Sequence, residues 1–181
     1  MRNVTDCSKL QKGKHETDET FKMKILLCKL GRKLGFEVDM EEPPETELGE
    51  LAIRHDVLWY IKPPEWIREL FGIMLSRNDL CPEYRTLVEK KQALRRELFA
   101  AFEIEGTDVT TKAMKGDISN LSKLPYGIIV VKRGRKETSK EPIRNRFEKA
   151  LIEFRSLHGP NNVIVVSFED IEKLAKRWGL K

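Results

Sequence analysis

The stretch "AAFEIEGTD", residues 100–108, decides the fold of this chain. It begins as a buried β-strand does, with apolar residues up to Ile104, but it also carries Glu103 and Glu105. Residues two apart in a strand point to the same face of a sheet. Burying two like charges on one face costs free energy unless a partner neutralises them. The stretch therefore predicts a buried strand whose two carboxylates need a charged partner.

Length and composition indicate one globular domain. The chain has 181 residues, of which 40% are hydrophobic and 35% are charged, as in soluble proteins with a sizeable core. No apolar run approaches the roughly 20 residues of a membrane span, and the N-terminus is polar, without the apolar core of a signal peptide. We therefore expect a cytoplasmic protein that does not cross a membrane.

The cysteines are few, odd in number and scattered at Cys7, Cys28 and Cys81. No CxxC pair occurs, so the sequence suggests neither a disulfide framework nor a zinc site. Cys28 is predicted to be a small core residue. Aromatic anchors of the core or of helix packing are expected at Trp59, Trp66 and Trp178.

Apolar periodicity predicts helices and strands that alternate along the chain. The runs "GIIVV" and "VIVV" are typical of strands covered on both faces. We therefore predict an α/β fold, a single domain with a mixed β-sheet flanked by helices, and a helical insertion at about residues 64–97. Helices are predicted at residues 18–35, 64–75, 82–97, 108–123, 140–157 and from 167 onward, and strands at 51–61, 98–105, 126–134 and 162–168.

Three carboxylates lie at strand positions that a purely structural explanation does not account for. They are Asp56, in the predicted strand 51–61, and the pair Glu103 and Glu105. If the two strands are neighbours, these acids converge. Converging carboxylates on rigid elements provide the oxygen ligands that Mg²⁺ prefers, and a metal-bound water is a route to a nucleophile that attacks phosphate.

These residues resemble the PD-(D/E)XK nuclease superfamily, whose members include restriction-endonuclease-like proteins. The family pattern is an acid in one strand, then E-x-K or a variant on the next strand, then a helix and an apolar strand. Here the pattern is "RHDVLWY…FAAFEIEGTDVTTKAMKGDISNLSKLPYGIIVV", and the likeness runs from about residue 15 to residue 131. The resemblance implies a restriction-endonuclease-like core and a metal-dependent nuclease, of restriction type, that hydrolyses DNA phosphodiester bonds.

The resemblance also implies roles for single residues. Asp56, Glu103 and the backbone carbonyl of Ile104 would hold Mg²⁺ (or Mn²⁺). Glu105 stands where the family usually has lysine, so it would position or deprotonate the attacking water. The missing positive charge would come from the next helix, through Lys112 or Lys115.

The first helix of this fold often carries a glutamate that holds a metal-bound water. Glu16 and Glu19 both qualify by position, and Glu19 is preferred as a metal ligand because it shares a helix face with Met23 and Leu26. Acids are also favourable at any helix N-terminus, whatever the function. His55 is interpreted as a surface or hydrogen-bonded histidine rather than a catalyst.

The net charge is +5, from 34 Lys and Arg against 29 Asp and Glu, which permits a polyanionic partner. We expect DNA as the partner, with RNA as the alternative, and a homodimer if both strands are cut. Basic runs are often only solvated surface. If these runs bind nucleic acid, the residues expected to contact phosphates are Lys90, Lys91, Arg95, Lys132, Arg133, Arg135 and Lys136.

Two other functions are consistent with the sequence. The first is a nucleic-acid-binding module that keeps the nuclease fold without catalysis. The second is a structural or interaction domain whose acids form salt bridges with Arg54, Arg95 or Arg96. Acids that converge and stay open to solvent favour a metal site, whereas acids sealed against arginines favour the structural role.

Overall fold

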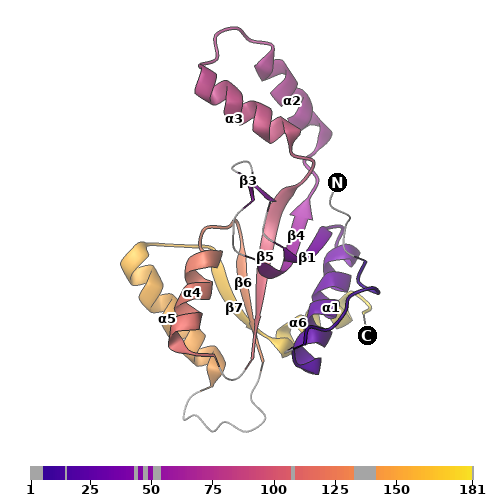
Figure 1. The fold of residues 1–181 in the computed structure, drawn as a ribbon, viewed down its shortest axis with the longest axis vertical. Coiled ribbons are helices and arrows are strands. Elements are labelled where there is room, and N and C mark those ends of the chain that lie inside the picture. The colour runs from indigo at the N-terminus through magenta and orange to yellow at the C-terminus, as the bar shows by residue number, and fades with distance from the viewer. Residues whose placement is uncertain are drawn as a thin grey trace.

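The computed structural model describes residues 6–14, 16–42, 45–46, 49–50, 54–106, 109–132 and 142–180. The helices are α1 (Asp18–Lys33), α2 (Glu65–Leu75), α3 (Pro82–Ala93), α4 (Thr111–Leu121), α5 (Ile143–His158) and α6 (Phe168–Arg177). The strands are β1 (Glu37–Glu42), β2 (Glu45–Thr46), β3 (Gly49–Glu50), β4 (His55–Ile61), β5 (Glu97–Glu105), β6 (Gly127–Val131) and β7 (Val163–Ser167). A five-stranded sheet in the order β1-β4-β5-β6-β7 carries helices on both faces (Figure 1). The predicted α/β fold class, a mixed sheet flanked by helices, is confirmed.

Strand β5 is the middle of the sheet, antiparallel to β4 and parallel to β6. Its side chains alternate between two separate hydrophobic cores. Phe102 and Ile104 belong to the core under α1, whereas Ala101 belongs to the core under α4 and α5. Glu103 and Glu105 therefore share the face of Ala101, as their spacing of two residues predicts.

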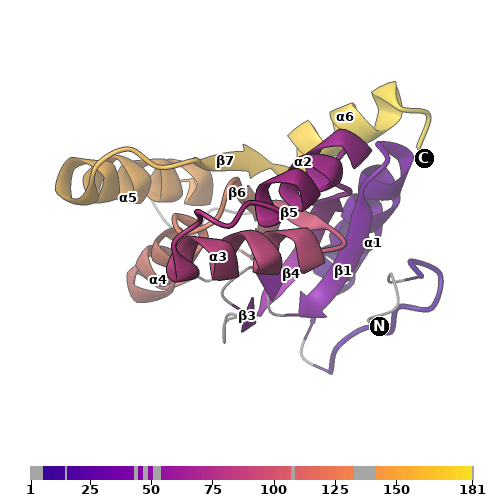
Figure 2. The ribbon, with the colours of Figure 1, turned by 90° about the horizontal axis from the view of Figure 1, so that it is seen from above.

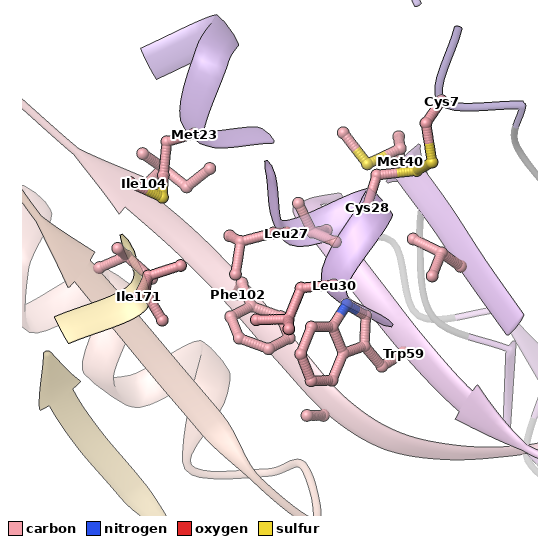
Figure 3. Close-up of a cluster of buried hydrophobic side chains, with 14 residues drawn as sticks. Cys7, Met23, Leu27, Cys28, Leu30, Met40, Trp59, Phe102, Ile104 and Ile171 are labelled. Atoms are coloured by element: carbon pink, nitrogen blue, oxygen red, sulfur yellow. A yellow bond between two sulfur atoms is a disulfide. The ribbon is translucent and has the colours of Figure 1, made fainter. Parts of the chain in front are cut away.

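Helix α1 packs closely on one face of the sheet (Figure 3). Leu27 and Leu30 are fully buried and lie in one cluster with Trp59 and Phe102. A Cβ atom added to Gly31 would lie 2.5 Å from Nε1 of Trp59. The close approach of α1 to the sheet therefore requires glycine at this position.

The opposite face is covered by α4 and α5. Ile118 of α4 and Phe147 of α5 are fully buried, and both belong to a cluster with Leu58, Ile129 and Val131 of the sheet. This second core fixes α4 against the sheet, so that side chains near its first turns are held next to the end of β5.

Helix ends follow local signals in the sequence. Helix α1 stops shortly before Gly35, whose φ of 90° lies in the left-handed region that favours glycine. Helix α6 begins with a reciprocal capping box between Ser167 and Asp170. The longest described helices, α1 and α5, have 16 residues each, and no helix in the described part of the chain is long and apolar enough to cross a membrane.

Helices α2 and α3 form a hairpin, here called the arm (residues 65–93), at the position of the predicted insertion. The arm joins β4 to β5 and stands away from the sheet, and a second view shows its two helices side by side (Figures 1 and 2). Within this fully described segment, α2 has no buried residue and α3 buries only Val88. Trp66 of the arm is 63% exposed and Trp178 is 46% exposed, so the expectation that they anchor packing is wrong, whereas Trp59 is buried.

A disulfide joins Cys7 to Cys28 (Figure 3). The expectation that the cysteines form no disulfide is therefore wrong. The N-terminal segment returns along α1, which brings the two Cα atoms to 5.9 Å, within the range that a disulfide spans. Cys28 is fully buried, as predicted, and Cys81 is a free, exposed cysteine at the start of α3.

Candidate active site at the acidic edge of the sheet

The predicted acids meet where β4 begins and β5 and β6 end, a place we call the acidic edge. Regular pairing of β4 with β5 stops at Val57 and Phe102. Just beyond it, Oδ2 of Asp56 accepts a hydrogen bond from the backbone N–H of Ile104 at 2.8 Å. The two strands are neighbours, so the condition for convergence of Asp56 with Glu103 is met.

A buried lysine of α1, Lys24, neutralises Asp56. Its Nζ atom lies 2.9 Å from Oδ1 of Asp56, 2.9 Å from Oε1 of Glu16 and 2.7 Å from Oε1 of Glu41. Burial by itself lowers the pKa of Lys24, but the three surrounding carboxylates outweigh burial and raise the pKa overall. The ammonium group therefore stays charged although its residue is only 7% exposed.

Glu41 reaches Lys24 from a strained position in β1. Its φ is 53°, in the left-handed region that costs a residue other than glycine about 1–2 kcal/mol. Such conformations persist where their surroundings hold them, and they gather at functional sites. The ion pair with Lys24 is one contact that holds Glu41 in this conformation.

Glu103 hydrogen-bonds to His55, the residue before Asp56. Nδ1 of His55 lies 2.6 Å from Oε1 of Glu103, and the histidine is 2% exposed. Burial raises the pKa of Glu103, hydrogen bonding to His55 opposes the rise, and the charge of Asp56 adds to it. Further positive charge at this place would stabilise the ionised form of Glu103.

Glu105 pairs with Asp117 of α4, a residue that sequence reasoning did not identify. The two carboxyl groups hydrogen-bond to each other. Burial, with the charges of Asp117 and Glu103, raises the pKa of Glu105 to about 8. Burial also raises the pKa of Asp117, to about 6. Near neutral pH the pair therefore holds one proton between two carboxyl groups.

The remaining predicted site residues are Glu19, Lys112 and Lys115. Glu19 forms an ion pair with Lys132. Lys115 lies 3.1 Å from Glu153 on the surface between α4 and α5, and Lys112 is exposed at the start of α4. The lysine nearest the acids is thus supplied by α1 and not by α4.

The arginines of the structural alternative are not seen on these acids. Arg96 is bound to Asp39, with Nη1 and Oδ1 3.0 Å apart, and Arg54 and Arg95 are exposed. In the part of the chain that the structure describes, the cation that pairs with Asp56 is Lys24.

The predicted basic surface divides between two ends of the sheet. Lys90, Lys91 and Arg95 lie on or next to the arm, where β5 begins, whereas the acids lie where β5 ends. Lys132 lies at the acidic edge, since its backbone N–H donates to the carbonyl of Glu105 at 3.0 Å. The remaining predicted contacts, Arg133, Arg135 and Lys136, lie outside the described residues.

A cavity of about 580 Å³ lies beside the acidic edge, at the carboxyl ends of the parallel strands β6 and β7. This is the end of an α/β sheet at which ligands usually bind. Three cationic residues line the cavity: Lys132, Arg144 and Lys173. Glu169 and Asp170 line it as well, so its charge is mixed with a cationic excess.

No group of three or more His, Cys, Asp or Glu residues that could hold a metal ion occurs among the described residues. In comparisons with known proteins, the chain matches no family model, no curated protein and no solved structure. The chemistry of the acidic edge therefore has to be inferred from its own geometry.

Replacing Glu105 with glutamine should change how stability depends on pH. Folding raises the pKa of Glu105 from 4.5 to about 8, so the folded protein binds more protons than the unfolded chain in this window and loses stability as pH rises through it. In a chelating buffer, Glu105→Gln should melt at a higher temperature than the wild type near pH 8, with a flatter dependence down to about pH 5. Glu153→Gln, at an exposed glutamate, should follow the wild type, and parallel curves for all three proteins would contradict the expectation.

Proposed function

We propose that this protein is a metal-dependent nuclease that hydrolyses phosphodiester bonds in DNA, with RNA as the alternative substrate. The observation that supports the proposal most is the meeting of Asp56, Glu103 and a buried lysine, Lys24, at one edge of a rigid sheet. Two carboxylates and one permanent cation are the groups that phosphodiester hydrolysis needs, for metal binding and for the charge of the phosphate.

The donor set at the acidic edge suits Mg²⁺ or Mn²⁺. Mg²⁺ is usually held by one or two carboxylates, with water and phosphate completing its shell, so a cluster of three protein side chains is not required. Asp56, Glu103 and the carbonyl of Ile104 would hold the ion. Burial and nearby carboxylates raise the pKa of Glu103, and the buried Oδ2 atom of Asp117 has no hydrogen-bond partner among the described atoms, so a bound cation would stabilise the ionised form of these acids.

When bound, the ion would polarise the phosphodiester and lower the pKa of an attacking water. The side chains of the chain supply the other steps. Lys24 would provide the positive charge that Glu105 cannot provide. It would face the phosphate when Asp56 also binds the metal ion and is therefore no longer paired with Lys24 alone. The pair of Glu105 and Asp117, with a raised pKa and one proton between them, would accept the proton of the attacking water.

The cavity beside the acidic edge supports a nucleic-acid substrate. Its cations, Lys132, Arg144 and Lys173, would contact phosphates near the bond that is cut. Phosphate contacts of this kind provide affinity that falls with salt and carry no sequence information. We therefore expect cleavage to weaken strongly as the salt concentration rises.

A cleavage assay on supercoiled plasmid, with Mg²⁺ or Mn²⁺ at low salt, tests the proposal. Asp56→Asn and Glu103→Gln should each lose activity by about 10²-fold or more, because each removes charge that acts on the transition state. Glu153→Gln, which changes an exposed glutamate in the same way, should cut like the wild type. A wild-type protein that cuts neither plasmid nor RNA with either ion would overturn the proposal.

A binding module without catalysis is the second candidate. It is favoured by the state of Asp56, whose two carboxylate oxygens are taken up by Lys24 and by the N–H of Ile104. In that case the wild type and Asp56→Asn would bind nucleic acid equally and neither would cut. The same plasmid, followed by gel shift as well as by cleavage, distinguishes the two functions.

A further inference from the structure

His55 is a buried histidine to which the proposed chemistry assigns no role. It is 2% exposed and begins strand β4, directly before Asp56. Burying an imidazole costs free energy unless its polar atoms are hydrogen-bonded. The partner of Nδ1 is Oε1 of Glu103, at 2.6 Å. His55 is therefore tied to one of the two acids proposed to hold the metal ion.

The direction of this hydrogen bond follows from the use of Glu103 as a metal ligand. A carboxylate must be ionised to bind a metal ion, and an ionised carboxylate only accepts hydrogen bonds. The proton of the contact therefore lies on Nδ1 of His55, which donates to Oε1 of Glu103. Oε2 is then the oxygen that remains for the ion.

The two acids of the site are held in different ways. Asp56 has a donor on each oxygen, Lys24 on Oδ1 and the N–H of Ile104 on Oδ2. Glu103 has a donor on Oε1 alone among the described residues, and 16% of its side chain is exposed. Glu103 therefore offers one oxygen in a fixed orientation at a place that solvent reaches.

We propose that His55 is a positioning residue, which limits Glu103 to binding the metal ion through one oxygen and so selects Mg²⁺ over Ca²⁺. The inference rests on the metal site of the proposed function. Ca²⁺ takes roughly six to eight oxygen ligands in a flexible shell and often binds both oxygens of a carboxylate. Mg²⁺ demands near-octahedral geometry, and the two oxygens of one carboxylate lie too close together for neighbouring corners of an octahedron. A carboxylate with one oxygen held by histidine therefore suits Mg²⁺.

The backbone around His55 is rigid enough for this role. Two residues further along β4, Val57 is fully buried and paired with Phe102 of β5. Glutamate has a long side chain that loses rotational freedom when it binds an ion, unless its surroundings orient it beforehand. Groups that orient a metal ligand typically change metal affinity or activity by about 10–100-fold when they are replaced.

Two amide substitutions separate positioning from packing. The amide nitrogen of asparagine takes the place of Nδ1 of histidine, whereas that of glutamine lies closer to Nε2. His55→Asn should keep the donor to Glu103 and bind Mn²⁺ within about threefold of the wild type, and His55→Gln should bind Mn²⁺ about 10–100-fold more weakly. Binding is measured on the full chain without nucleic acid, from the electron paramagnetic resonance signal of free Mn²⁺.

Competition between ions gives a readout that a purely structural role would not change. Mg²⁺ and Ca²⁺ are each titrated against bound Mn²⁺, and the ratio of the two midpoints measures selectivity. His55→Gln should shift this ratio toward Ca²⁺ by about tenfold, because Oε1 of Glu103 becomes available to the ion. His55→Asn should keep the ratio of the wild type. His158→Gln is the control, since His158 is exposed at the end of α5, and it should change neither value.

Infrared spectra of the wild type test the same point without a variant of His55. Binding through one oxygen widens the separation between the two carboxylate stretching bands, whereas binding through both oxygens narrows it. Addition of Mg²⁺ should widen the separation for a carboxylate whose bands disappear in Glu103→Gln. A narrowed separation would overturn the proposal.

The binding experiments also distinguish this proposal from the proposed function. Equal affinity and selectivity in His55→Gln and the wild type, or a wild type that binds no Mn²⁺ at millimolar concentrations, would overturn the role of His55. Selectivity that depends on His55, in a wild type that cuts neither plasmid nor RNA, would refute the nuclease alone. Cleavage by the wild type together with unchanged selectivity in His55→Gln would refute the role of His55 alone.

Discussion

Lys24→Met is expected to reduce plasmid cleavage by about 10²–10³-fold, the loss that follows removal of one group that stabilises transition-state charge. Methionine keeps the length and the apolar stem of lysine but removes the ammonium group. That group lies between the carboxylates of Asp56, Glu16 and Glu41, and at the acidic edge no lysine of α4 takes its place. The measurement is the initial rate of cleavage at saturating Mg²⁺.

Lys115→Met is the matched control. It removes the same charge from a lysine whose side chain is 50% exposed and paired with Glu153, so it should cut like the wild type. Thermal melts at several pH values separate loss of chemistry from loss of folding. Without Lys24, its three carboxylates repel one another and take up protons in the folded state, so the variant should be less stable at neutral pH and recover as the pH falls. Equal rates for Lys24→Met and the wild type would show that the lysine does not act in cleavage.

Arg96→Met is expected to destabilise the fold by about 3–5 kcal/mol, as is typical when one partner of a buried ion pair is removed. Arg96 and Asp39 are 7% and 2% exposed, and their two hydrogen bonds are 3.0 Å and 2.5 Å long. The guanidinium group also lies 4.1 Å from the ring centroid of Tyr60. Removing Arg96 leaves a buried carboxylate without its cation, and urea denaturation measures the change in the free energy of unfolding.

Two further variants show whether burial of the ion pair causes the expected loss of stability. Arg77→Met breaks a similar pair with Asp79, but these side chains are 58% and 68% exposed, so the free energy of unfolding should stay close to that of the wild type. Combining Arg96→Met with Asp39→Leu removes both charges and should recover most of the lost stability. A double variant as unstable as Arg96→Met would mean that shape, rather than charge, dominates at this place.

Sequence patterns were sufficient to predict the strands of the sheet and the positions of Glu103 and Glu105 on one face of a strand. The continuous apolar runs of β6 and β7 and the spacing of Glu103 and Glu105 carry this information locally, since burial on both faces and alternation are properties of a strand. The position of Asp56 followed from the order of the strands.

The partners of the acids could not be predicted in the same way, because they come from three different elements. A signal for them does exist in helical spacing. Lys24 lies three and four residues before the buried Leu27 and Cys28, and Asp117 lies three residues after the buried Met114. A charged residue on the apolar stripe of a helix indicates a buried partner, but its identity depends on distances that one sequence does not contain.

For the tryptophans, the sequence predicts a buried position that the structure does not show at Trp66. Both Trp59 and Trp66 are expected to anchor packing, yet of the two only Trp59 faces α1, whereas Trp66 lies on an arm outside the core. Local hydrophobicity predicts that a side chain should be covered, but it does not say whether the cover comes from the same chain.

The disulfide between Cys7 and Cys28 makes the redox history of a sample relevant to measurements at the acidic edge. The bond closes a loop that contains Glu16, one of the carboxylates around Lys24. A preparation kept in a thiol reductant and one kept in air therefore differ in how firmly that carboxylate is held on the lysine. Rates of the proposed cleavage measured on the two preparations would describe two different acidic edges, and a comparison of variants would be valid only within one preparation.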